Sequence, residues 1–228
     1  MHPILTLNDP FTMFIVVVAG ILIVGYLIGR ARNRRYAQII SSWLEPGLRS
    51  LGGSPVVQAV TRTAFRVKIT QARAPFNVAT ATVVLLSREV LPIWLWEWIN
   101  RHSDVVFFHL TLRRNPHITL EIVNVASELG RRGKDQAQKL QWPLATTQGN
   151  YYLYCPADTS SDHHLKKLFT HVTEGRFTPH RVAIRTNAPH VLASFSFSDL
   201  QRAPSAELVR WLTTLVRLLP LDEGGEAS

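Results

Sequence analysis

The sequence predicts an α+β protein with one N-terminal transmembrane helix, and three observations support this prediction. An uncharged apolar run covers residues 11–29. After it, segments that alternate apolar and polar residues interleave with segments of helical periodicity. The connections between the predicted strands are rich in Asn, Pro and Gly, as they are in antiparallel hairpins. We therefore expect a membrane anchor followed by a domain of antiparallel β-hairpins packed with helices.

Composition excludes several classes of protein. The chain has 228 residues, 46% of them hydrophobic, and a net charge of +9 with His neutral. This apolar fraction is ordinary for a globular protein and excludes wholesale disorder. The single cysteine, Cys155, excludes an intramolecular disulfide framework and a Cys-rich zinc site. The sequence contains no P-loop, no Gly-x-Gly-x-x-Gly and no His-Glu-x-x-His.

The apolar run at 11–29 has the length of a membrane span. As a helix, its 19 residues extend roughly 28 Å, which is close to the thickness of a hydrocarbon core. A cleaved signal peptide is the alternative, but it needs a basic segment before a shorter apolar core. Here the cations follow the run instead, as Arg30, Arg32, Arg34 and Arg35. We expect these four arginines at the membrane interface, facing anionic headgroups.

The same arginines predict the orientation of the anchor. Only His2 and Asp9 precede the run as side chains that could carry charge, and cationic flanks stay on the cytoplasmic side. Residues 1–10 are thus expected outside and the C-terminal domain in the cytoplasm. The membrane is the plasma membrane in a prokaryote or the endoplasmic reticulum in a eukaryote. Gly25 and Gly29 form a Gly-x-x-x-Gly that could pack on another helix, although glycine is also common in membrane helices.

The remaining chain divides into predicted segments by periodicity and turn residues. Residues 30–62 form a basic juxtamembrane and helical segment, with a helix break expected at Pro46 and a turn at 52–55. A first α+β unit covers 63–126, a polar connector 127–150, a second unit 151–220 and an acidic tail 221–228. Within the connector, residues 134–141 could form a helix. Strands are predicted at 64–70, 78–86, 105–113, 118–126, 151–155, 181–186 and 191–197, and helices at 91–101, 162–173 and from Pro204 onward.

The periodicity of three of these segments also predicts which face is buried. In 64–70, Phe65, Val67 and Ile69 lie on one face of a half-buried strand, and Arg66 and Lys68 lie on the other. The two later helices each have one apolar face, formed by Leu165, Leu168, Phe169 and Val172 in the first and by Leu208, Trp211, Leu212, Leu215 and Leu219 in the second.

The two units resemble each other in their turns. The strands 105–113 and 118–126 are expected to form a hairpin across Arg-Asn-Pro-His, and 181–186 and 191–197 a hairpin across Asn-Ala-Pro-His. With a helix before each hairpin, they suggest two related αββ units. Asn, Pro and His also populate turns without any duplication.

The predicted helix 91–101 is apolar on both sides. Leu91, Trp94 and Trp98 share one face with further apolar residues, and that face is expected in the core. Ile93 and Trp96 fall on the other side. We consider two explanations for this second face: burial within the α+β core, or contact with a partner or the membrane interface, where Trp is favoured.

Two tripeptides suggest an alternative, enzymatic function. His109-Leu110-Thr111 and His171-Val172-Thr173 resemble the His-x-Thr motifs of the two-histidine phosphoesterase family. That resemblance implies that His109 and His171 act as acid and base while Thr111 and Thr173 hold a phosphodiester. Helical spacing places His171 on a helix, whereas the family carries both motifs on strands.

The other histidines do not predict a metal site. His163, His164 and His171 share the predicted helix 162–173, but only Asp162 and Glu174 offer carboxylates nearby. We expect solvent-facing histidines there. No metal, cofactor or small-molecule ligand is inferred from the sequence.

The layout as a whole resembles the calumin family, the coiled-coil-domain membrane proteins of the translocon-associated PAT complex. The resemblance covers about 11–219 and is best at 65–69, from 78–86 into 91–101, at 105–112 and at 165–172. It implies a non-enzymatic function: binding another membrane or membrane-associated protein and assisting membrane-protein biogenesis near a translocon.

Two departures from the calumin family bear on the partners. The family has a long acidic outer segment and a basic coiled-coil tail, and this sequence has neither before residue 11 or after about 219. The missing tail puts in doubt any ribosome contact that depends on it. Four arginines beside a membrane are explained by the membrane, so nucleic acid is not expected as a partner beyond proximity to a ribosome.

Overall fold

A computed structural model describes residues 10–100, 102–159 and 163–221, and it confirms the α+β class with one long apolar N-terminal helix and a nine-stranded antiparallel sheet. Contacts divide the chain into unit 1, Met1–Ile40 with Leu85–Ser103, and unit 2, Ser41–Val84 with Asp104–Ser228. The predicted outer N-terminus and acidic tail lie almost wholly outside the described residues.

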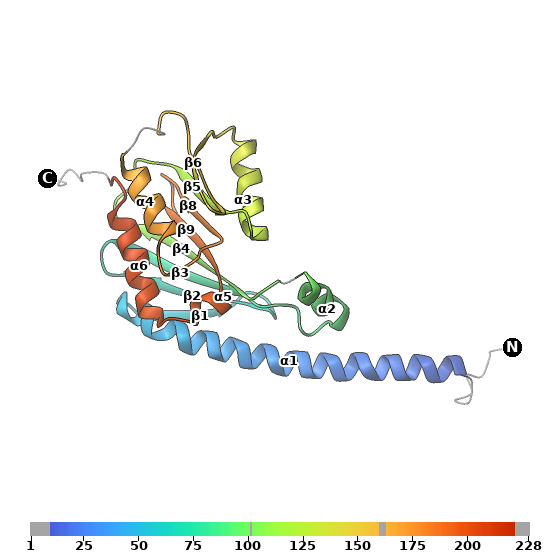
Figure 1. Cartoon of the computed structure of the whole chain (residues 1–228). Helices are drawn as coiled ribbons and strands as arrows, with labels where there is room; N and C mark the ends of the chain where they lie inside the picture. The colour runs from blue at the N-terminus through green and yellow to red at the C-terminus, as the bar shows by residue number, and fades with distance from the viewer. Residues whose placement is uncertain (1–9, 101, 160–162, 222–228) are drawn as a thin grey trace. The chain divides into compact units, whose positions relative to one another are not determined.

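The helices and strands alternate along the chain (Figure 1). The helices are α1 (Pro10–Ser50), α2 (Leu91–Ile99), α3 (Glu128–Lys139), α4 (His163–Thr173), α5 (Phe197–Leu200) and α6 (Ser205–Arg217). The strands are β1 (Pro55–Ala59), β2 (Ala64–Thr70), β3 (Phe76–Val84), β4 (Val105–Leu112), β5 (Leu120–Asn124), β6 (Leu144–Gln148), β7 (Tyr151–Tyr154), β8 (Arg181–Ile184) and β9 (Val191–Ser196).

Helix α1 continues through Pro46, so the predicted helix break is wrong. Packing within unit 2 explains the difference. Leu44 and Leu48 are buried, and the Trp43 indole N–H donates to the carbonyl of Ala203 at 2.9 Å. The Gly47 N–H donates to Ser205 Oγ, also at 2.9 Å. These contacts offset the hydrogen bond that Pro46 cannot donate.

The strand order is β1-β2-β3-β4-β9-β8-β5-β7-β6, with every pair antiparallel. The predicted hairpin of β8 and β9 is confirmed, but the predicted hairpin of β4 and β5 is wrong, because β9 and β8 lie between them. The two proposed αββ segments are therefore not equivalent in the sheet. Turn residues alone did not determine which strands pair, since pairing here depends on contacts distant in sequence.

Segment 127–150 is not simply a polar connector. It contains α3, which the Ser127 hydroxyl caps at Gly130 N, and strand β6, which pairs with β7 at one edge of the sheet. Strand β1 at the opposite edge was also missed. Both edge strands are exposed along their whole length, so they lack the apolar-polar alternation that marks a half-buried strand.

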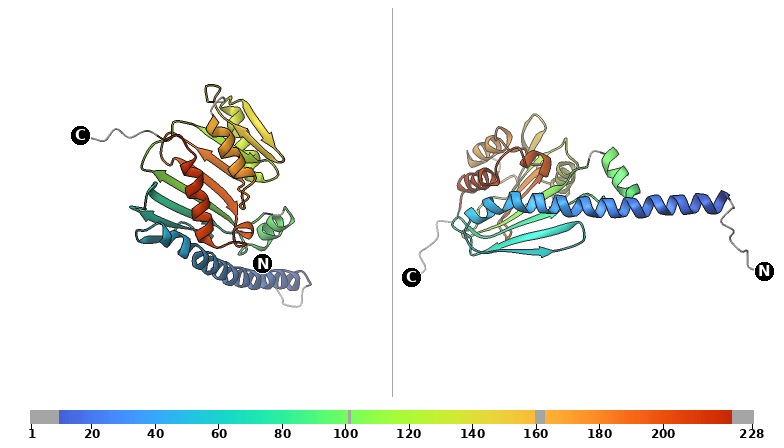
Figure 2. Two further views of the ribbon diagram at one scale, coloured as in Figure 1. Left: turned by 60° about the vertical axis from the view of Figure 1, so that its left-hand side comes forward. Right: turned by 90° about the horizontal axis from the view of Figure 1, so that it is seen from below.

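Helices α4 and α6 lie on one face of the sheet in unit 2 (Figure 2), which we call the covered face. There Trp211 of α6 packs edge-on against Phe195 of β9, which packs against Phe108 of β4. The apolar positions predicted for α4 and α6 are confirmed as buried: Leu165, Leu168, Phe169 and Val172 in α4, and Leu208, Trp211, Leu212 and Leu215 in α6.

Gly47→Ala tests the packing of α1 in unit 2. Alanine is the better helix former, by about 1 kcal/mol in an exposed helix. At Gly47, however, an added Cβ would lie 2.7 Å from the backbone of Ser205. We expect the free energy of unfolding to fall by about 1–3 kcal/mol, as measured by urea denaturation in detergent micelles.

Gly20→Ala in the same helix is the matched control, because no atom lies within 4 Å of the Cβ that it adds. An equal change in both variants would contradict tight packing at Gly47.

Candidate functional site

Helix α1 is long and apolar enough to cross a membrane, and none of its most apolar 18-residue stretch is buried in the described structure. Large apolar side chains on all sides of this stretch are exposed, among them Phe14, Ile21, Val24 and Leu27. A helix that is apolar all round and unburied is suited to lipid. Arg30, Arg32, Arg34 and Arg35 follow it, and all four are exposed.

Near the end of the apolar stretch, one side of α1 contacts another segment of the same chain. Gly25 lies against Leu91, and Gly29 lies against the backbone of Arg88, both within unit 1. A Cβ on Gly29 would overlap the carbonyl oxygen of Arg88. Gly25 and Gly29 therefore share a face that lies against the chain's own segment 85–103, with Gly25 at the first residue of α2 and Gly29 at the turn before it.

On the same side of α1, one and two turns after Gly29, Asn33 and Tyr36 make polar contacts with segment 85–103. Asn33 is 3% exposed; its Nδ2 donates to Leu86 O at 3.2 Å and its Oδ1 accepts from Arg88 Nη1 at 3.1 Å. The Arg88 guanidinium lies 4.3 Å from the centre of the Tyr36 ring. Because both polar ends of the Asn33 amide are satisfied, segment 85–103 is fastened to α1 along several turns.

Helix α2 follows these contacts and has no buried residue. Ile93 and Trp96, predicted to contact a partner or the membrane, are 47% and 65% exposed. The prediction that the opposite face is core is wrong, because Trp98 is 65% exposed as well. The alternative expectation, burial of Ile93 and Trp96, is likewise not what the described residues show. Sequence periodicity finds apolar faces but does not distinguish protein core from another apolar medium.

The structure does not bring the two His-x-Thr motifs together. His171 stacks on Trp211, with ring centres 5.1 Å apart, on the covered face. His109 neighbours Phe108 on β4, so strand alternation directs it to the opposite face. Thr111 shares that opposite face, while Thr173 donates to Gln148 Oε1 at 2.8 Å. The sheet separates the histidines, so these four residues lack the shared cleft that phosphodiester chemistry requires.

Burial lowers the pKa of both histidines, although they lie on opposite faces of the sheet. Burial lowers the pKa of His171, and the hydrogen bond to the carbonyl of Trp211 only partly opposes this. Burial and the nearby Arg66 guanidinium lower the pKa of His109. Both rings are thus favoured in the neutral form. His163 and His164 begin α4, and no group of three metal-ligating side chains gathers among the residues that the structure describes.

The face opposite α4 and α6 carries two exposed cations on β2, the second strand from one edge of the sheet, and we call it the open face. Pairing places Arg66, Thr82 and Phe107 in one row across β2, β3 and β4, and Lys68, Thr80 and His109 in the next. Arg66 and Lys68 are exposed, as the alternation of strand 64–70 predicted. Strands β2, β3, β4 and β9 contain no Asp or Glu, so no acidic side chain of these strands offsets the two cations.

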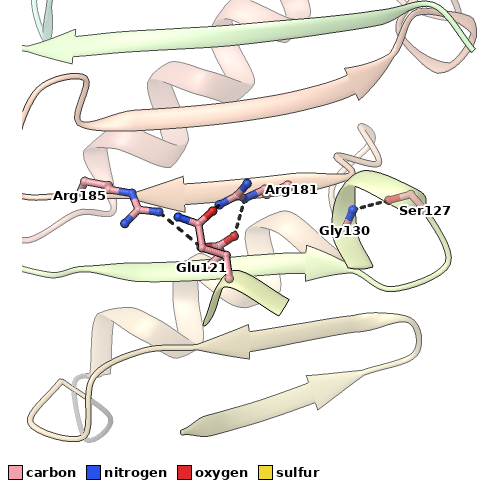
Figure 3. Close-up of polar contacts among 6 residues, drawn as sticks. Glu121, Ser127, Gly130, Arg181 and Arg185 are labelled. Carbon is pink, nitrogen blue, oxygen red and sulfur yellow. Dashed lines mark hydrogen bonds and ion pairs between the residues drawn. The ribbon is translucent and has the colours of Figure 1, made fainter. Parts of the chain in front are cut away.

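A buried charge cluster lies at the far end of this face, beneath α3 (Figure 3). Glu121 of β5 is fully buried; its carboxylate pairs with Arg181 Nε and, at 3.5 Å, with Arg185 Nη2. Arg181 Nη2 also donates to Gln136 Oε1 of α3 at 2.7 Å. Burial raises the pKa of Glu121, and the two guanidinium groups oppose that shift. Sequence reasoning missed this cluster, although Glu121 is the only charged residue of strand β5.

The Glu121 cluster fastens α3 to the sheet rather than opening a site. Gly133 of α3 leaves room for the carboxylate, since a Cβ there would lie 2.7 Å from Glu121 Oε1. Val123, Ala137 and Tyr154 form a small apolar core beside it. The charges are therefore enclosed between β5, β8 and α3.

A comparison of the chain with protein-family models and with curated proteins gives no match.

Glu121→Ala should destabilise the fold because it leaves two partly buried guanidinium groups without a counter-charge. We expect a loss of about 3 kcal/mol in the free energy of unfolding, the lower end for a broken buried pair, since Arg181 and Arg185 are 26% and 27% exposed. Chemical denaturation in detergent micelles measures it.

The matched control is Glu128→Ala, which removes an exposed pair with Arg132 and should cost less than about 1 kcal/mol. If the two variants were equally stable, the Glu121 cluster would not fasten α3.

Proposed function

We propose that the protein is a single-pass membrane protein whose cytoplasmic α+β unit binds another membrane-associated protein and assists membrane-protein biogenesis near a translocon. The observation that carries this proposal is the continuity of α1. Only Arg30–Ile40 separates the apolar stretch from unit 2, about 16 Å of helix. Because residues 30–40 are continuous helix, no flexible linker separates the apolar stretch from unit 2 along the chain.

Charge supports the orientation that the proposal requires. Four exposed arginines follow the apolar stretch, and cationic segments beside a span stay in the cytoplasm. Unit 2, which follows them, is then cytoplasmic. The same arginines favour anionic headgroups, so the bilayer itself is the first partner.

The open face is the surface that we assign to the protein partner. Strands β2, β3 and β4 are free of acidic residues; β2 presents Arg66 and Lys68 to solvent, and Phe107 and His109 of β4 are half-buried in the same rows. Such a surface suits a partner that offers acidic side chains with some apolar area, because charge complementarity guides the encounter. The resemblance to the calumin family supports biogenesis as the setting.

Site-specific photocrosslinking in cells tests this function. A photoreactive phenylalanine analogue at Lys68 should crosslink a membrane-associated protein, and the yield should fall when puromycin releases nascent chains. The same analogue at Arg210, exposed on α6 over the covered face, is the control and should give little product.

Arg66→Glu should reduce the Lys68 crosslink several-fold, because it opposes an acidic partner without entering the core. Equal yields at Lys68 and Arg210, or a Lys68 yield that is insensitive to both puromycin and Arg66→Glu, would contradict the proposed function.

A further inference from the structure

Helix α2 combines high apolar content with exposure. Eight of its nine residues are apolar or proline, and the exception, Glu97, accepts a hydrogen bond from Ser87 N at 2.8 Å. Five large side chains are between 47% and 65% exposed: Ile93, Leu95, Trp96, Trp98 and Ile99. Soluble proteins rarely leave so large a contiguous apolar surface in water.

The place of α2 within unit 1 indicates what covers it. Its first residue, Leu91, lies against Gly25, one helical turn or about 6 Å before the apolar stretch of α1 ends. Figure 1 shows α2 beside this part of α1. The exposed apolar surface of α2 is thus continuous with the lipid-facing surface of α1, at the depth where hydrocarbon gives way to headgroups.

Polar groups mark the same boundary. Asn33 and Arg88 satisfy each other one turn beyond Gly29, and the exposed arginines Arg30, Arg32, Arg34 and Arg35 lie at this level of α1. Cationic and aromatic side chains gather where a membrane protein crosses the interface. Three of the nine residues of α2 are Trp, the residue most typical of that region.

We propose that α2 is a second membrane element, a short helix seated in the cytoplasmic interface of the bilayer with Trp96, Trp98 and Ile99 in contact with lipid. Nine residues extend only about 14 Å, too short to span, so α2 lies at the interface rather than crossing it. Its backbone tolerates this place: the Asn100 N–H and Nδ2 both donate to the carbonyl of Trp96, which closes the last turn.

The inference rests on the anchoring part of the proposed function and adds a consequence to it. A lone span can slide along the bilayer normal and tilt toward any of its sides. With α2 fastened to the Gly25, Gly29 and Asn33 side of α1 and seated at the interface, sliding or tilting α1 would draw α2 out of the interface. The depth and the tilt of α1 in the bilayer are then restricted.

Spin-label accessibility in vesicles tests the inference with the full chain. Cys155, buried and the only cysteine, is first replaced by Ala. Nitroxide labels are then placed singly through Trp96→Cys and Ile99→Cys, with Val17→Cys in α1 as the lipid reference and Lys139→Cys, exposed on α3, as the water reference. Vesicles contain phosphatidylcholine and phosphatidylglycerol, and collisions with oxygen and with a water-soluble nickel chelate are compared.

Both α2 labels should behave like the Val17 label, with oxygen collisions raised and nickel collisions lowered several-fold relative to Lys139. Two labels are used because the loss of one Trp could disturb α2 locally. If Val17 reports lipid but both α2 labels report water, the inference fails and the anchor stands. Labels shielded from both reagents would mean that protein covers α2, which also overturns it. A Val17 label in water would refute the anchor and the proposed function.

Discussion

The backbone of a chain in hydrocarbon must satisfy its own hydrogen bonds, and the structure depends on how α1 meets that constraint. Its apolar stretch is unburied, while its last turns are fixed within unit 2 by Trp43, Gly47 and Leu48. Because one helix does both, no linker separates the apolar stretch from the folded unit. Gly25, Gly29 and Asn33 give the same helix a third task, since they hold segment 85–103 against it. The apolar stretch, the contacts with segment 85–103 and the contacts within unit 2 therefore follow one another along the single helix α1.

In unit 2 the sheet separates two environments. The covered face carries the aromatic packing of Phe108, Phe195 and Trp211, among the buried apolar side chains of the sheet, α4 and α6. The open face has two exposed cations on β2, and the buried Glu121 carboxylate with its arginines holds α3 at the far end of this face. His171 lies on the covered face and His109 on the open face, so the sheet separates the two histidines and they do not form a catalytic pair. The fold thus presents an unburied apolar helix and a separate sheet face with exposed cations, the two features on which the proposed function rests.

Local pattern predicted those parts of the fold that depend on neighbouring residues. The alternation of Val67 and Ile69 with Arg66 and Lys68 located β2 and its exposed face, and helical spacing located the buried sides of α4 and α6. Contacts distant in sequence defeated prediction. Ser205 accepts a hydrogen bond from Gly47 and so supports α1 beyond Pro46. Strands β9 and β8 lie between β4 and β5, which were expected to pair. Arg181 of β8 forms an ion pair with Glu121 of the adjacent strand β5, 60 residues earlier in the chain. The apolar faces of α2 were visible in the sequence, but which medium covers them depends on where Gly25 places the helix.

Membrane insertion of α1, with its arginine end in the cytoplasm, can be measured directly in sealed membrane vesicles of known orientation. The chain should stay with the bilayer through an alkaline carbonate wash. In vesicles that enclose the cytoplasmic side, unit 2 should resist an external protease until detergent is added. Release of the full-length chain into the carbonate supernatant would contradict the span, and digestion of unit 2 in such sealed vesicles would contradict its orientation.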